Sequence, residues 1–142
     1  HTFEYCNSLT IVSIPPSVTS IGEYAFQNCS SLTKIKIPSS VKSIGRYTFA
    51  DCKSLTDIEI PPSVTSIGEC AFQKCSSLGK IKIPSSVKSI GSYTFVDCKS
   101  LTDIENLPSV TSIGEYAFIN CSLLEKNPTY SDIIRRSNYP YL

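Results

Sequence analysis

The sequence of 142 residues has no methionine, no tryptophan and a single histidine, at position 1. It also has no excess of charge, because 13 basic side chains face 12 acidic ones and the formal net charge is +1. Such a balance gives no field that would attract nucleic acid. No apolar stretch approaches the roughly 20 residues of a membrane-spanning helix, so we expect no direct insertion of this segment into a membrane.

The scarcity of histidine bears on catalysis. A nucleophilic or acid–base site needs a nucleophile beside a base, and no serine, cysteine or aspartate pairs persuasively with His1. A structural zinc site needs closely spaced cysteines, whereas here one cysteine occurs every 23 residues. We therefore predict a protein that is not an enzyme and has no cofactor and no metal site.

Phenylalanine and cysteine recur with a constant period of 23 residues. The phenylalanines are Phe3, Phe26, Phe49, Phe72, Phe95 and Phe118, and the cysteines are Cys6, Cys29, Cys52, Cys75, Cys98 and Cys121. One unit holds too few apolar residues for a core of its own. The repeat therefore predicts a solenoid in which stacked turns share one core.

Each unit predicts a very short strand and then a turn. Ile35 and Ile37 alternate with polar residues, and Pro38 follows directly. One serine and one glycine then recur per unit: Ser17, Ser40, Ser63, Ser86 and Ser109, and Gly22, Gly45, Gly68, Gly91 and Gly114. We expect the serine hydroxyls to bond backbone groups of neighbouring turns, and the glycines to mark a bend that a Cβ atom would hinder.

A second period of 46 residues lies over the first. Residues 17–62 and 63–108 differ at seven positions, and adjacent 23-residue units differ more. Odd and even turns of the solenoid are therefore chemically distinct.

The repeat resembles the BspA-like, Treponema-type leucine-rich repeats, whose pattern is L-x-x-I-x-I-P-x-S-V-x-x-I-G-x-x-A-F-x-x-C. The resemblance implies an α/β solenoid: a right-handed leucine-rich-repeat horseshoe with short parallel strands on the concave face and short helical or 3-10 turns on the convex face. It also implies a family that is found on the surfaces of mucosal bacteria and parasitic protists, where its members resemble adhesins. Asn106 and Leu107 depart from the pattern, so we expect a weaker fifth strand.

The cysteines leave three interpretations open: buried reduced thiols, strained disulfides between stacked turns, or metal ligands. The spacing of one cysteine per turn favours a row of buried thiols. Cys70 lies outside this row, where other units have tyrosine. We expect its side chain to be more exposed, as drift in one repeat or as a site of intermolecular pairing.

The outward positions of the predicted strands carry charges that alternate in sign from turn to turn. One row is Ile11, Lys34, Asp57, Lys80, Asp103 and Lys126, and the second is Ser13, Lys36, Glu59, Lys82 and Glu105. The charges either neutralise one another or form a concave face that docks a protein partner. A balanced face of this kind predicts binding that depends only weakly on salt.

A second candidate surface is an aromatic row on the convex side. It consists of Tyr24, Tyr47, Tyr93 and Tyr116. Tyrosine is favoured at protein interfaces because it combines apolar area with a hydroxyl group. The alternative is that these rings pack between turns.

The two ends differ from the repeat. Residues 1–124 form the predicted solenoid, whose first turn is incomplete, and residues 125–142 form a C-terminal cap or a flexible tail. An uncovered solenoid end exposes its core and a sheet edge. We therefore expect either further residues upstream or self-association through the N-terminal end.

The predicted function is a non-enzymatic protein–protein interaction module. The leading interpretation is a cell-surface or extracellular adhesion protein that binds a host matrix or cell-surface protein. The alternative is an intracellular, cytoplasmic scaffold or regulatory adaptor, which the seven cysteines and the absence of a visible signal segment favour.

Overall fold

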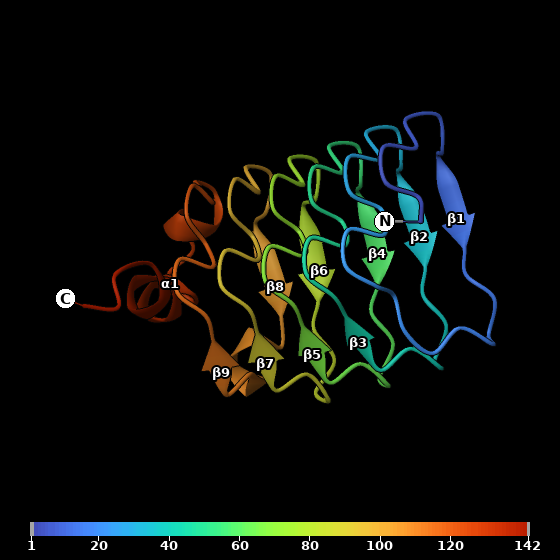
Figure 1. Ribbon diagram of the computed structural model, residues 1–142. Helices are drawn as coiled ribbons and strands as arrows, with labels where there is room; N and C mark the ends of the chain where they lie inside the picture. Colours follow the sequence, from blue (N-terminus) through green and yellow to red (C-terminus); the bar gives the residue numbers. More distant parts are fainter. Residues whose placement is uncertain (1, 142) are drawn as a thin grey trace.

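Short parallel strands recur once per 23-residue unit along one side of the molecule (Figure 1). In the computed structural model, which describes residues 2–141, they are β1 (Ile11–Ser13), β2 (Lys34–Lys36), β4 (Asp57–Glu59), β6 (Lys80–Lys82) and β8 (Asp103–Glu105). The register joins each residue to the one 23 positions later, as in Val12 with Ile35. The predicted solenoid is confirmed, and we call this side the strand face.

A second parallel sheet, which the sequence did not predict, runs beside the first. It consists of β3 (Ser43–Ile44), β5 (Ser66–Ile67), β7 (Ser89–Ile90) and β9 (Ser112–Ile113), in that order. These strands are only two residues long, which is too short for an alternating pattern to be recognised. Their isoleucines point into the same core as those of the strand face.

The convex segments are successive hydrogen-bonded turns and contain no helix. In one unit, the amide of Ala25 donates to Gly22 O (3.3 Å) and that of Cys29 donates to Phe26 O (3.2 Å). Tyr24 and Asn28 have φ values of 61° and 59°, so left-handed residues interrupt any helical run. The predicted fold class is confirmed, but helices are minimal: in the described residues they are η1 (Leu107–Ser109), η2 (Leu124–Lys126) and α1 (Ser131–Asn138).

The core is a set of ladders with one rung per turn. The phenylalanine rings stack without interruption from Phe3 to Phe118, with centroids 5.3 to 5.9 Å apart. The predicted serine bonds are confirmed in the interior, where Ser63 Oγ donates to Val41 O at 2.6 Å and Ser86 Oγ donates to Val64 O at 2.6 Å. Each interior turn therefore donates hydrogen bonds to backbone carbonyls of the neighbouring turn and also buries that turn's apolar side chains.

The recurring glycines of the later turns are explained by close contact between turns. A Cβ atom on Gly91 would lie 2.4 Å from Glu69 N, and one on Gly114 would lie 2.2 Å from Ser92 N. None of the described glycines has a positive φ, so glycine is required here for space and not for backbone conformation.

Strand β8 is as long as the other strands of its sheet, so the expected weakening of the fifth strand was wrong. The departure from the repeat begins directly after β8, where Asn106 adopts a left-handed conformation (φ 68°) and η1 follows. Asn106 and Leu107 thus change the turn behind the strand and leave the strand intact.

Beyond the last turn, α1 lies across the end of the stack (Figure 1). Side chains from this segment take the places that a further turn would occupy. Ser137 Oγ accepts from Ala117 N (3.0 Å), Asn138 Oδ1 accepts from Phe118 N (3.2 Å), and the Tyr130 hydroxyl accepts from Ile104 N (3.3 Å). No helix in the described part of the chain is long and apolar enough to cross a membrane.

Candidate functional site

The strand face presents the predicted charged residues in two rows. The register places Lys34 beside Asp57 and Lys36 beside Glu59, and in the second half Lys80 beside Asp103 and Lys82 beside Glu105. The side chains point outward because the isoleucine between each pair points into the core. Charges of opposite sign therefore alternate along the axis of the solenoid.

Ion pairs form between only some of these charged residues. Lys34 Nζ lies 3.4 Å from Asp57 Oδ2, and Lys82 Nζ lies 3.9 Å from Glu105 Oε1. All four side chains are more than half exposed, so each pair contributes about 0 to 1 kcal/mol. In the described residues, Lys36, Glu59 and Lys80 have no oppositely charged atom within 4.0 Å.

Asp103 is held by the C-terminal segment. It accepts a hydrogen bond from the hydroxyl of Tyr130. Burial, together with this bond, raises the pKa of Tyr130. Asp103 is thus hydrogen-bonded to the C-terminal segment, and Lys80 on the neighbouring turn has no carboxylate within 4.0 Å in the described residues.

The ladder of the strand face is interrupted between β4 and β6. The described strands form one sheet of β1, β2 and β4 and another of β6 and β8. Thr33 bonds Thr10 O through its amide (2.8 Å) and its hydroxyl (3.0 Å), whereas Gly79, at the same position two units later, has no hydroxyl. The loss of this threonine coincides with the break in the sheet.

A shallow hollow of about 390 Å³ lies at the interruption. Its lining combines charged and apolar side chains: Asp57, Ile58, Glu59, Ile60, Pro62, Lys82 and Pro84. The hollow thus brings charges of both signs together with apolar side chains on the strand face.

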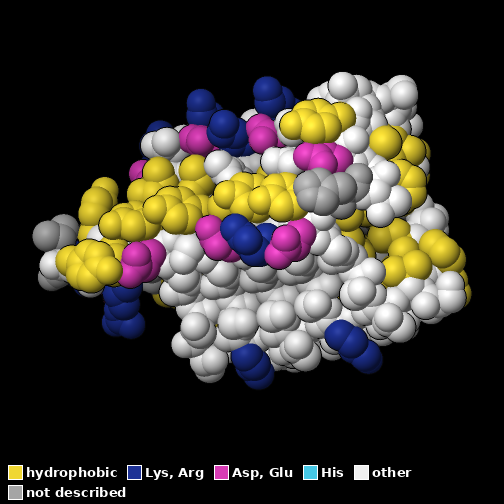
Figure 2. Space-filling view, in the orientation of Figure 1, with side chains coloured by type: hydrophobic (Ala, Val, Ile, Leu, Met, Phe, Trp, Pro, Cys, Tyr) yellow, Lys and Arg dark blue, Asp and Glu magenta, His cyan; other side chains and the backbone are white. Residues whose placement is uncertain are grey.

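The aromatic row forms two separate pairs. Tyr24 stacks on Tyr47 with centroids 4.9 Å apart, and Tyr93 stacks on Tyr116 at 5.5 Å. On the face shown in Figure 2, a hydrophobic stripe runs along the molecule between lines of charged residues. Most of the area of the tyrosine rings is covered by neighbouring turns, and only Tyr93 reaches 41% exposure. Both packing between turns and outward display are therefore observed.

Cys70 separates the two tyrosine pairs and is buried, with 3% of its surface exposed. The expectation of a more exposed side chain was therefore wrong. Tyr47 shares a hydrogen bond with Cys70, and this bond is the main cause that raises the pKa of Tyr47 to about 12. Arg46 lies over the Tyr47 ring, 5.7 Å from its centroid.

The cysteine row lies in the core and points along the stack. From Cys29 to Cys121, each thiol of the row donates to a phenylalanine carbonyl of the previous turn, as Cys75 Sγ does to Phe49 O at 3.1 Å. Burial raises the pKa of Cys52 and of Cys121 to about 12. All the cysteines of the described chain are free, and thiols so held are poor nucleophiles. His1 lies outside the described residues.

The family model for the BspA type leucine-rich repeat region matches residues 1–125 in 6 copies. Among solved structures, a leucine-rich repeat protein of Bacteroides ovatus is 38% identical (TM-score 0.77) over 86% of this chain and 32% of that one. The leucine-rich repeat protein of T. pallidum is 31% identical (TM-score 0.75) over 96% and 74%. A leucine-rich cell surface protein of Faecalibacterium prausnitzii is 36% identical (TM-score 0.78) over 87% and 34%.

The chain therefore spans about a third of the length of two of these relatives. No protein of curated function matches the sequence.

Proposed function

This chain belongs to the BspA-type leucine-rich repeat family, and on that basis we propose that it is a protein-binding module of a cell surface, where it acts in adhesion without catalysis. The observation that carries the proposal is the strand face, a rigid sheet surface with charges of both signs and a central hollow. Repeat proteins commonly bind through such extended surfaces, because a stacked backbone displays side chains at fixed spacing.

The hollow between β4 and β6 is the proposed centre of the docking surface. Glu59 has no ion-pair partner there, and Lys82 has only a long, exposed one with Glu105. A partner with an acidic and a basic group gains charge-assisted hydrogen bonds without breaking a strong internal pair. Pro62, which is exposed, supplies apolar area beside these charges, whereas Ile58 and Ile60 are buried beneath them.

The proposed location and partner rest on resemblance. The relative from Faecalibacterium prausnitzii is a cell surface protein, and the 34% of its length that aligns with this chain is 36% identical. An adhesive surface module would meet matrix proteins or proteins of other cells. We therefore name extracellular matrix proteins as the partner class.

The docking surface is testable by a charge exchange that leaves the net charge unchanged. The variant Glu59→Lys with Lys82→Glu reverses both charges at the hollow, and the control Lys99→Glu with Glu125→Lys does the same away from it. Surface plasmon resonance would compare their binding to immobilised collagen, fibronectin and laminin. We expect the first variant to bind about 10-fold more weakly and the control to bind like the wild type.

Two results would count against the proposal. Equal losses in both variants would place the docking surface elsewhere, with the tyrosine row as the next candidate. Absence of wild-type binding to all three proteins would remove the matrix as the partner class.

Because the charges on the strand face balance, binding should weaken only slightly between low and moderate salt, and a steep loss would argue against this face.

A second function, an intracellular scaffold, is favoured by one observation: the described cysteines are all free. Antibody labelling of cells that express the full-length protein separates the two functions. Labelling of intact cells supports the surface module. Labelling only after permeabilisation supports the scaffold.

A further inference from the structure

The second sheet presents a row of hydroxyl groups on its outer side. In β3, β5 and β7 the isoleucine is buried and the serine before it points outward. The register aligns these serines from turn to turn, Ser43 with Ser66 and Ser66 with Ser89. None of the three hydroxyls has a hydrogen-bond partner in the part of the chain that the structure describes. They are therefore available to a ligand.

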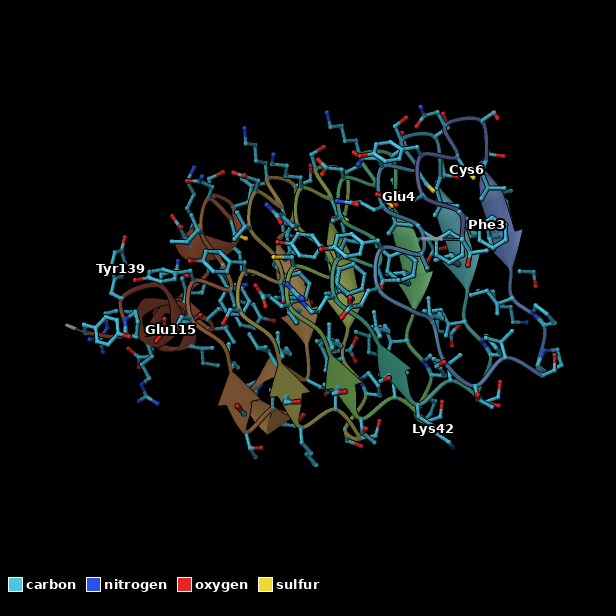
Figure 3. All side chains as sticks on the ribbon, in the orientation of Figure 1. Phe3, Glu4, Cys6, Lys42, Glu115 and Tyr139 are labelled. Carbon is cyan, nitrogen blue, oxygen red and sulfur yellow. The ribbon has the colours of Figure 1, made fainter. Side chains whose placement is uncertain are left out.

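A second row beside these serines alternates threonine with lysine: Thr19, Lys42, Thr65, Lys88 and Thr111. Successive members are joined through the main chain, since Thr65 N donates to Lys42 O (3.0 Å) and Lys88 N donates to Thr65 O (3.0 Å). Lys42 and Lys88 are exposed, and neither has an oppositely charged atom within 4.0 Å among residues 2–141. Figure 3 shows Lys42 extending from the molecule beside β3. We call the two rows together the hydroxyl face.

The hydroxyl face contains no acidic residue. Each turn contributes one segment to it, and none of these segments has an aspartate or a glutamate: residues 15–22, 38–45, 61–68, 84–91 and 107–114. In Figure 2 the face occupies the lower part of the view, and acidic side chains lie only along its upper border. The two lysines therefore give this face a positive charge, which is complementary to an anion.

Other lysines of the molecule have the same spacing of two turns but different surroundings. Those of the strand face lie next to aspartate or glutamate of neighbouring strands. Lys53 and Lys99 each follow an aspartate by two residues. An anion at those lysines would also meet carboxylates, which repel it. The segments that carry Lys42 and Lys88 have no such carboxylate.

The spacing of the charges indicates which polyanion fits. Lys42 and Lys88 are two turns apart, and neighbouring strands lie about 4.8 Å apart, so a positive charge recurs about every 10 Å along the solenoid axis. A duplex nucleic acid has one phosphate per about 3.4 Å of each strand, so most of its phosphates would have no partner here. A polysaccharide in which uronic acid alternates with a neutral sugar has one carboxylate per disaccharide, and an extended disaccharide is about as long as two turns.

We propose that the hydroxyl face binds an acidic polysaccharide of this kind, which lies along the axis of the solenoid. Successive carboxylates pair with Lys42 and Lys88. The hydroxyls of the turn between them, Thr65 and Ser66, face the neutral sugar, whose own hydroxyls can donate and accept hydrogen bonds. Because the charge pairs are exposed, each contributes about 0 to 1 kcal/mol, and binding by one chain is weak.

The repeat itself supplies the variants for the test. Lys42→Thr with Lys88→Thr replaces each lysine by the residue that the intervening turn has at the same position. The control, Lys53→Ser with Lys99→Ser, removes the same charge at the same spacing and also introduces the residue of the intervening turn. Surface plasmon resonance would measure the binding of each protein to immobilised hyaluronan, to dextran as a neutral polysaccharide and to poly-glutamate as an acidic peptide.

We expect the wild type and the control to bind hyaluronan equally, and the variant at Lys42 and Lys88 to bind it about 5-fold more weakly. Dextran and poly-glutamate should bind more weakly than hyaluronan. A wild type that does not bind hyaluronan overturns the proposal, as does an equal loss in the variant and the control. Equally tight binding of dextran would remove the role of the lysines, and equally tight binding of poly-glutamate would make the ligand an acidic peptide. Circular dichroism verifies that each variant is folded.

The inference goes beyond the proposed function and does not rest on it. Its variants leave the strand face unchanged, and its probe is a polysaccharide and not a matrix protein. The two surfaces also differ in their expected salt dependence. The hydroxyl face has charge of one sign, so its binding to hyaluronan should weaken steadily as salt is raised. Failure of one proposal therefore leaves the other in place.

Discussion

The first turn and the interior turns contain the same repeat but differ in what surrounds each residue. Phe3 is 45% exposed, whereas Phe72 is fully buried between Phe49 and Phe95. A Cβ atom on Gly22 would meet nothing within 4 Å, whereas one on Gly91 would meet backbone at 2.4 Å. Since the local sequence is nearly constant, the difference comes from the preceding turn, which the first turn lacks in the described structure.

The lesson is that most of the stability in this fold lies between turns. Rings, serine hydroxyls and thiols all contact the neighbouring unit, and one unit has little core of its own. The same substitution can therefore be compared in the first turn and in an interior turn. The difference in the free energy of unfolding measures what contacts between turns contribute.

The largest difference in stability between interior and first-turn substitutions is expected for phenylalanine. Phe72→Ala leaves a cavity between two stacked rings and should reduce the free energy of unfolding by about 4 kcal/mol. Phe3→Ala removes a ring that is stacked on one side only and should cost about 1 kcal/mol. Urea unfolding at low protein concentration would measure both, and equal losses would contradict the dominance of contacts between turns.

The glycines give the next contrast. Gly91→Ala forces a methyl group against the backbone of Glu69 and should cost about 3 kcal/mol. Gly22→Ala meets open space and should leave stability unchanged or raise it by up to about 1 kcal/mol, because alanine restricts the unfolded chain. Thermal unfolding of the two variants checks the prediction, and a destabilised Gly22→Ala would show that a local bend matters.

These ladders explain which features the sequence predicted. A period of 23 residues without insertions determines the stacking, and stacking determines that each serine or glycine meets the same neighbours. The solenoid, the inward phenylalanines and cysteines and the serine bonds were therefore predictable. The residues proposed for docking were placed on the strand face by the same periodicity, although their role remains a prediction.

Features outside the period were not predictable. Ser137 and Asn138 lie in a non-repeating segment, and nothing in their sequence indicates that they bond the last turn. The left-handed conformation of Asn28 has a recognisable signal, since asparagine favours it, but that of Tyr24 has none. The burial of Cys70 depends on how its neighbours cover a smaller side chain, which spacing does not describe.

Alkaline pH should destabilise the interior through its thiols. An exposed thiol in the unfolded chain ionises near its ordinary pKa of 9.0, whereas burial holds the pKa of Cys75 well above that value. The folded state therefore binds more protons above pH 9, and stability should fall as the pH rises beyond this point. Each such thiol contributes up to about 1.4 kcal/mol per pH unit.

The variant Cys75→Ala isolates this effect. This variant should have a lower free energy of unfolding at neutral pH. Between pH 9 and the pKa of the folded thiol, its free energy of unfolding should fall less with pH than that of the wild type. Urea unfolding at several pH values would measure both effects. Val64→Ala, which is also fully buried, should lower the stability without changing the pH dependence. An identical pH slope in all three proteins would mean that other groups cause the alkaline loss.

The smallest effect is expected where neighbouring turns meet at the surface. Lys34 and Asp57 are 60% and 64% exposed, so a double-mutant cycle of Lys34→Ala and Asp57→Ala should give a coupling energy below about 0.5 kcal/mol. Added salt should reduce it further. A coupling energy above about 1 kcal/mol would mean that this ion pair stabilises the folded state. The pair would then oppose docking, because Lys34 and Asp57 must separate before they bind the charges of a partner. A weak coupling instead leaves Lys34 and Asp57 free to exchange each other for the charges of a partner.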